Sequence, residues 1–552
     1  MRDRRKIFGK HRKKSKWKII AALGCIVTAG AAFSIFYASA NGEKEVSDED
    51  ELRERVSQIS EVYTEEYQEK VKERLEKVKA SGEYTEDHML IEPDPFGTNS
   101  LSLYVYFKTD EPARVSYSVS VDDVDISDFS AVPDSEKTAE TEHEFQVIGL
   151  VPGLENRVTF TVAYEDGMEE TFKYIEEDVS IAGEEEIRLS TEDVSENADA
   201  ELSDGLYVIL GNDSDELDYM YYYDNEGVLR GEVPLIGYRS HRLLFRDGLM
   251  YYSISETKIA AIDSLGMVEA VYDLGSYELH HDYGFDEDGN LLILATDTES
   301  NTVEDQVIRV DTQTGEITGT LDLRQLFPDY MENFVDGDSQ ELDWIHINTL
   351  QYLEDETLIL SSRETSSIIK VSDAFSDPKI EYMIGDEGFW EGTGYEDLLM
   401  QKDETGGVFS DTGGQHSVTY VWDDSLPDGQ YYLYMFNNNF GISESREYDW
   451  SAIEGIETSM KEGENSFYYK YLVDENKGTY RLEESFEVPF SAYVSSAQEY
   501  NGNIVIDSGM AGVFGEYDQD GNLLREYEME LAKNYIYRVY KYDFSEFLTI
   551  LD

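Results

Sequence analysis

Cysteine is almost absent from this 552-residue chain, and Cys25 is its only example. One thiol excludes an intramolecular disulfide, so the fold must be stable through burial of its core. Proline is also scarce, with 10 residues, whereas aromatic residues make up 13% of the chain. That composition is typical of a folded, β-rich protein even though 29% of the residues are charged. Because the chain is too long for one ordinary core, we expect two or more domains.

Positive charge is scarce beyond the N-terminus. The formal net charge is -74, although residues 1–18 contain ten Lys or Arg and a single Asp. A chain this acidic repels nucleic acid and anionic lipid surfaces, so we expect no nucleic-acid partner. An anionic substrate would then need a local positive site inside the fold.

A long apolar run follows the basic residues 1–18. Residues 19–40 carry no charge, and ~20 apolar residues suffice to cross a bilayer as a helix. The basic flank places residues 1–18 in the cytoplasm and the rest of the chain outside it. We therefore expect a single-pass membrane anchor. The alternative is secretion after cleavage of a signal peptide, because Ala38-Ser39-Ala40 fits a small-x-small cleavage site.

The next segment has a helical pattern. Across residues 46–80 apolar side chains recur at steps of three or four, and Glu and Lys fill most other positions. We expect one helix here, ended by Ser81-Gly82. It is either a stalk that spaces or dimerises the chain above the membrane, which makes a homodimer possible, or a helix packed on its own globular domain.

Short strands with turns follow over residues 89–190. Residues 102–107, 113–120 and 157–164 alternate between apolar and polar side chains, the period of a half-buried strand. About 100 residues of this kind predict a small β-sandwich of immunoglobulin or fibronectin type. No catalytic constellation is apparent in it.

A loose repeat fills residues 205–552. It reads as a strand, an acidic turn ending in Gly, another strand, a polar gap and a further strand; the turns are Asp224 to Gly227, Asp286 to Gly289 and Asp518 to Gly521. Repeated units of strands without helices predict a β-propeller, and the length fits six blades. Two stacked β-sandwiches are the alternative. The expected fold is thus all-β, apart from the anchor and the stalk.

Histidine is concentrated in the predicted propeller. Of eight His in the chain, five lie there: His241, His280, His281, His346 and His416. Each stands just before a strand-like run. In a propeller, residues at the start of the innermost strands face one mouth of the central channel, so these imidazoles are expected to converge.

Several motifs together resemble the bacterial arylsulfate sulfotransferase family. They are Asp343-Trp-Ile-His-Ile-Asn348, Leu358-Ile-Leu-Ser-Ser-Arg363, Ile384-Gly-Asp386 before Gly388-Phe-Trp390, Gly414-Gln-His416, and His281-Asp282. The resemblance covers roughly residues 90 to 550. It implies a six-bladed propeller behind a small β domain, and transfer of a sulfuryl group from an aryl sulfate ester to a phenolic acceptor. It also implies a sulfated histidine intermediate and no nucleotide sulfate donor. The chain lacks the cysteine pair that periplasmic relatives carry near the site.

The same resemblance assigns roles to five residues. His416 would be the nucleophile, with His281, His346, Asn348 and Arg363 as its partners. Adjacent His280 leaves an ambiguity, and we choose His281 because an acidic residue follows it. The chemistry suits these side chains: a neutral imidazole is both nucleophile and leaving group, and a planar guanidinium can grip two sulfuryl oxygens. Asn348 can donate a further hydrogen bond, and His346 or His281 can serve the departing phenolate.

Two other functions remain open from the residues alone. Convergent histidines could hold a transition metal in a propeller lyase or hydrolase, although no close pair of His supplies a ligand motif. A membrane-anchored propeller can also be a binding protein without catalysis. The resemblance favours an enzyme with no cofactor and no metal. For His241 the simplest interpretation is structural.

Overall fold

The structure is a computed structural model that describes residues 48–551 except 178, 194–200, 213–218, 238, 336–340 and 461–463. The predicted membrane helix at 19–40 lies outside the described residues. Among the helices that the structure describes, none is long and apolar enough to cross a bilayer.

Two helices, not one, occupy the predicted stalk. They are α1 (Asp48–Val62) and α2 (Glu65–Ser81). The break falls at Thr64, whose side chain caps the second helix by accepting from the backbone N–H of Tyr67. The apolar period runs on across this corner, so the sequence pattern does not reveal it.

Both helices pack against the rest of the chain. Ile59 and Val62 join a core cluster with strands of both β domains, and Val71 and Leu75 join a second cluster. The hydroxyl of Tyr63 donates to the carbonyl of Pro234 at 2.7 Å. The apolar stripe is therefore buried on the protein itself, which fits the packed helix and not the free spacer; a homodimer stays a prediction.

The small β domain is organised around one long strand. Strand β2 pairs with four other strands, two mainly along its first half and two along its second half. The strands are β1 (Leu90–Pro93), β2 (Ser102–Val121), β3 (Phe129–Pro133), β4 (Glu140–Ile148), β5 (Asn156–Tyr164), β6 (Glu169–Glu176) and the distant β33 (Leu548–Leu551). Apolar side chains on alternate positions of β5 and of the second half of β2 form its core, while the first residues of β2 are buried on both faces.

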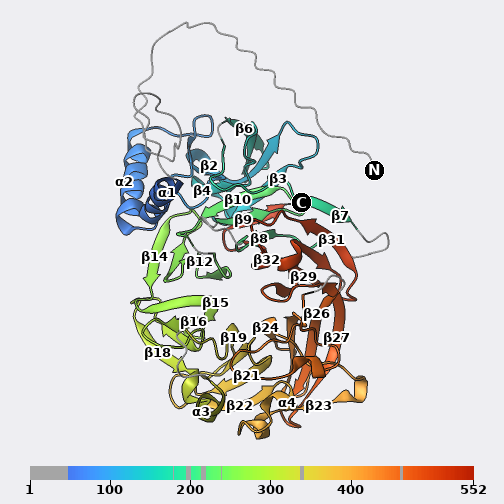
Figure 1. Cartoon of the computed structure of the whole chain (residues 1–552). Helices are drawn as coiled ribbons and strands as arrows, with labels where there is room; N and C mark the ends of the chain where they lie inside the picture. The colour runs from blue at the N-terminus through green and yellow to red at the C-terminus, as the bar shows by residue number, and fades with distance from the viewer. Residues whose placement is uncertain are drawn as a thin grey trace, which may run out of the picture. The chain divides into compact units, whose positions relative to one another are not determined.

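Six sheets make up the predicted propeller, and Figure 1 shows them following one another around it. From inner to outer strand, blade 1 is β32 (Val539–Tyr542), β8 (Leu206–Ile209), β9 (Tyr219–Tyr223) and β10 (Leu229–Pro234). Blade 2 is β11 (Leu244–Arg246), β12 (Leu249–Ser255), β13 (Lys258–Ile262) and β14 (Val268–Asp273). Blade 3 is β15 (Tyr277–Phe285), β16 (Leu291–Asp297), β17 (Gln306–Val310) and β18 (Ile317–Asp322).

The other three blades carry the longer insertions. Blade 4 is β19 (Ile347–Tyr352), β20 (Leu358–Ser362), β21 (Ser367–Ser372) and β22 (Lys379–Ile384). Blade 5 is β24 (His416–Val421), β25 (Gln430–Asn437), β26 (Asn465–Asp474), β27 (Thr479–Pro489) and β23 (Gln401–Lys402). Blade 6 is β28 (Ser496–Tyr500), β29 (Asn503–Ser508), β30 (Val513–Tyr517), β31 (Leu523–Glu528) and β7 (Ser190–Asp193). Short helices α3 (Pro328–Phe334) and α4 (Glu387–Trp390) lie between strands.

Strands from the two ends of the propeller close the ring. Strand β32 completes blade 1 beside β8, and β7 completes blade 6 beside β31. The domain boundaries expected at 190 and 205 therefore shift, because β7 belongs to the propeller. The C-terminal strand β33 pairs instead with β3 of the small β domain. The expected propeller span 205–552 thus ends with a strand of the other domain.

Three inner strands are irregular at a histidine. In each, the pairing register shifts and a non-glycine residue takes a positive φ, a conformation that costs about 1–3 kcal/mol and is common at functional sites. The positive φ values are 52° at His281 in β15, 46° at His346 just before β19, and 56° at Ser417 in β24. His281 thus lies inside its strand and not before it, as the sequence suggested.

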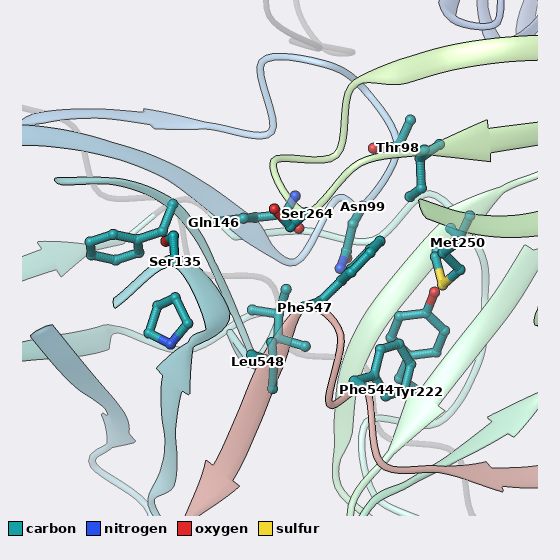
Figure 2. A pocket seen from close by; sticks show the side chains of 15 residues that line it. Thr98, Asn99, Ser135, Gln146, Tyr222, Met250, Ser264, Phe544, Phe547 and Leu548 are labelled. Atoms are coloured by element: carbon teal, nitrogen blue, oxygen red, sulfur yellow. The ribbon is translucent and has the colours of Figure 1, made fainter. Parts of the chain in front are cut away.

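A small cavity lies between the two β domains, and Figure 2 shows its walls. Its lining includes Asn99, Gln146, Tyr222, Met250 and Phe547. The volume is about 30 Å³, which is room for about one water molecule. None of the histidines of the propeller lines it, so this cavity is not the substrate site.

Candidate functional site

His416 is held in one tautomer. Its Nδ1 lies 2.9 Å from the carbonyl oxygen of Gly414 and 2.7 Å from Oδ1 of Asn438. The Asn438 amide cannot be reversed without loss, because its Nδ2 donates to the carbonyls of Ser491 and Val494. Both partners of Nδ1 are acceptors, so Nδ1 carries the proton and donates it. In the neutral ring Nε2 then keeps its lone pair.

The three predicted histidines come together. The ring centroids of His281 and His346 are 4.8 Å apart, and those of His281 and His416 are 6.4 Å apart. All three side chains are buried or nearly so. Inner strands of adjacent blades thus bring residues up to 135 positions apart in the sequence to one place.

Two carboxylates hold His346. Its Nδ1 lies 2.6 Å from Oε2 of Glu304 and 2.5 Å from Oδ2 of Asp343. The same Glu304 oxygen is 3.2 Å from Nε2 of His281, so one carboxylate bridges two imidazoles. Asp343 also receives a hydrogen bond of 3.2 Å from the guanidinium of Arg363.

The histidines differ in charge for physical reasons. Burial pushes the pKa of His346 down, but Glu304, together with Asp343, outweighs burial and raises the pKa to about 9. Burial, reinforced by the nearby positive charge of Arg538, holds the pKa of His416 well below its usual value. Burial likewise lowers the pKa of His281. At neutral pH the site therefore combines a cationic His346 with neutral His416 and His281.

Arg363 lies beside these rings at the end of β20. Its backbone N–H donates to the carbonyl of His346 at 3.0 Å, which ties the two residues together across blade 4. Gly414 packs beside it, at a φ of 62° and so close to the carbonyl of Phe440 that a Cβ would stand 3.0 Å from that oxygen. Within the described part of the chain no acceptor meets the buried Nε of Arg363, which leaves this donor unpaired.

Asn348 has a supporting contact. Its side chain is fully buried, and Nδ2 donates to the carbonyl of Gln415 at 2.7 Å, next to His416. One of its two N–H groups therefore fixes the strand that carries His416. A direct hydrogen bond from Asn348 to a sulfuryl oxygen stays a prediction.

Two clusters bring together enough donor atoms to suggest a metal. One is His280, His281 and Glu304, and the other is Glu304, Asp343 and His346. Two ligands bound to one ion at ~2.1 Å stand about 3.0–3.4 Å apart. The contacts of 2.5 and 2.6 Å at Nδ1 of His346 are closer than that, and Arg363 already bonds Asp343. The geometry of the second cluster therefore describes an ion pair and does not fit a metal centre.

Two family models match most of the described chain. The Arylsulfotransferase (ASST) model matches residues 191–538, and the Arylsulfotransferase Ig-like domain model matches residues 90–177. The chain belongs to the arylsulfotransferase family. It is therefore an arylsulfotransferase, with an aryl sulfate as donor and a phenol as acceptor.

Solved structures resemble this arylsulfotransferase only distantly, and curated proteins give no match. A protein of unknown function from Bacteroides caccae is 11% identical over 61% of this chain and 98% of its own, with a TM-score of 0.37. A putative 6-phosphogluconolactonase from Bacteroides fragilis is also 11% identical, over 79% and 99%, with a TM-score of 0.34. Likenesses at these scores carry no argument about function.

The arylsulfotransferase site contains residues that the sequence did not reveal. Buried Arg538 donates to the carbonyls of His281 and Asn348 at 2.7 and 2.8 Å, tying two inner strands together. The hydroxyl of Tyr537 lies 3.0 Å from Nδ1 of His281 and 3.1 Å from Nδ1 of His241. These residues precede β32, and only ring closure brings them to the other histidines.

The contacts of His280, His281 and His241 help to assign their roles in the arylsulfotransferase. His281 contacts Glu304 and lies beside both His346 and His416, whereas His280 meets His281 edge-on, with centroids 5.3 Å apart. These contacts favour His281 as the site residue. His241 is fully buried behind Tyr537, consistent with a structural role.

Proposed function

We propose that sulfuryl transfer proceeds in two steps through a sulfated His416, in ping-pong order. The observation that carries the proposal is the pair of acceptors at Nδ1 of His416, which leaves the Nε2 lone pair free to attack. In the first step Nε2 bonds to sulfur while the bond from sulfur to the aryl oxygen breaks. In the second step the acceptor phenol takes the sulfuryl group and frees Nε2.

Charge at the site suits an anion. A sulfuryl group in transfer spreads negative charge over its peripheral oxygens, as a phosphoryl group does. Arg363, cationic His346 and buried Arg538 surround His416, against an otherwise strongly acidic chain. Arg363 can grip two of the oxygens, and a neighbouring imidazole can serve the phenolic oxygen as acid and then as base.

The test is to trap the intermediate. Incubation of the protein with 4-nitrophenyl sulfate and no acceptor is expected to add one sulfuryl group, released by later addition of a phenol. Intact mass measurement followed by peptide mapping under neutral conditions should locate the group on His416. A burst of 4-nitrophenol without any adduct, or an adduct on another residue, would reject the proposed intermediate.

We propose further that residues 19–40 anchor the enzyme in the cell membrane, with the catalytic domains outside the cytoplasm. The support is the uncharged run behind ten basic residues. The full chain should remain in carbonate-washed membranes, and a chain beginning at residue 41 should be soluble. A mature protein whose first residue is 41 would instead establish the cleaved signal peptide.

A further inference from the structure

Glu304 is built into the site from a neighbouring blade. It lies in the loop between β16 and β17 of blade 3, yet its carboxylate contacts His346 of blade 4. Its backbone is fixed on both sides: the N–H donates to Oγ1 of Thr296 at 2.8 Å, and the carbonyl accepts from Ile347 at 3.1 Å. A φ of 55° adds to the cost of this conformation.

The number of hydrogens on the ring of His346 explains how Glu304 acts on it. Nδ1 of His346 carries one hydrogen, and Asp343 accepts it. The second carboxylate, from Glu304, lies 2.6 Å from the same nitrogen and can only share that one hydrogen, so its effect is mainly electrostatic. Two negative charges at one edge of a ring stabilise the doubly protonated imidazolium. In that form Nε2, the nitrogen away from the carboxylates, also carries a proton.

The geometry points to Glu304 as a positioning residue that keeps His346 protonated at Nε2, which makes His346 the acid of the first step and the base of the second. This inference rests on the proposed function. As the bond from sulfur to the aryl oxygen breaks, the Nε2 proton passes to the departing phenolate. In the second step the acceptor O–H returns a proton to Nε2 while the bond between sulfur and His416 breaks. The proton balance over one turnover is zero.

The pKa of His346 suits proton transfer to and from a phenolic oxygen. A phenol has a pKa of ~10, and His346 is raised to about 9, so proton transfer between them is nearly balanced in both directions. His281 shares Glu304, but burial keeps it neutral, and its Nε2 faces the carboxylate. It is therefore placed to orient Glu304 and not to supply the proton.

The test compares two donors in the Glu304→Gln variant. Phenyl sulfate releases a basic phenolate that needs a proton, whereas 4-nitrophenyl sulfate releases a weakly basic one that does not. In single-turnover reactions without acceptor we expect phenyl sulfate to react about 100-fold more slowly than in the wild type. The loss with 4-nitrophenyl sulfate should stay below about tenfold. Glu299→Gln, in the exposed part of the same loop, is the matched control and should leave both rates unchanged.

A pH profile completes the test. His346 gains its proton affinity from the carboxylates, so wild-type phenyl sulfate cleavage should fall only as pH rises through about 9. In Glu304→Gln that fall should begin at least one pH unit lower. Equal losses with both donors, or a stoichiometric metal ion in the wild type that Glu304→Gln lacks, would overturn the inference. Wild-type protein that cleaves both donors without sulfating His416 would instead reject the proposed function.

Discussion

His416→Asn is expected to abolish sulfuryl transfer while the propeller stays folded. The variant removes Nε2, the only nitrogen of this ring left with a lone pair, and so removes the proposed nucleophile. The amide nitrogen of the new Asn can stand where Nδ1 stood and donate to the same two oxygens. We expect turnover to fall by at least about 10³-fold, because loss of a covalent nucleophile leaves only binding and charge stabilisation.

Stability separates this loss from misfolding. His416 is 2% exposed, so the smaller side chain leaves a space that should cost about 1–2 kcal/mol in the free energy of unfolding. Thermal unfolding of the variant should therefore remain cooperative, with a midpoint temperature only slightly below that of the wild type. No sulfuryl adduct should form on the variant with 4-nitrophenyl sulfate. Turnover within tenfold of the wild type would remove His416 from the mechanism.

Much of the fold follows from local patterns in the sequence. Strands such as β2 and β5 were recognisable from alternating apolar and polar side chains, and acidic turns such as Asp286 to Gly289 close as hairpins through the hydrogen bond between their end residues. Strand β7, which joins the propeller, and strand β33, which joins the small β domain, were not recognisable from the sequence. Alternating side chains can indicate that a segment is a strand, but they do not indicate which strand it pairs with. These two short strands pair with residues hundreds of positions away.

Some residues of the site could likewise be predicted from the sequence, and others could not. His281, His346 and His416 could be predicted because each blade of a propeller has an inner strand. Residues at the start of these strands face the same mouth of the central channel in every blade. Glu304, Tyr537 and Arg538 could not. Glu304 reaches His346 from a loop of the neighbouring blade, and Arg538 reaches the site only because β32 closes the ring. A lone Glu among 118 acidic residues gives no sign in sequence that it faces two imidazoles.

Arg363→Lys should be severely impaired although the positive charge is kept. A lysine offers a compact ammonium on a flexible stem, and it cannot present two parallel N–H donors to two sulfuryl oxygens. In the native site one guanidinium nitrogen holds Asp343 at 3.2 Å while Nε meets no acceptor in the described chain. An ammonium that keeps the Asp343 contact would draw the charge away from the substrate. We expect kcat/KM to fall roughly 10²–10³-fold, in the range for loss of a donor aimed at transition-state charge.

The matched control for this substitution is Arg309→Lys. Arg309 also pairs with a carboxylate, Glu356, at 2.9 Å, but this ion pair joins blades 3 and 4 without contacting the histidines. Its kcat/KM should be unchanged. The Arg363→Lys loss should appear with phenyl sulfate and 4-nitrophenyl sulfate alike, because both donors present the same sulfuryl oxygens. That equal loss differs from the donor-dependent loss expected of Glu304→Gln, so the two variants separate recognition of the sulfuryl group from protonation of the phenolate. Arg363→Lys activity close to that of Arg309→Lys would show that charge alone, without the two-pronged contact, suffices at this position.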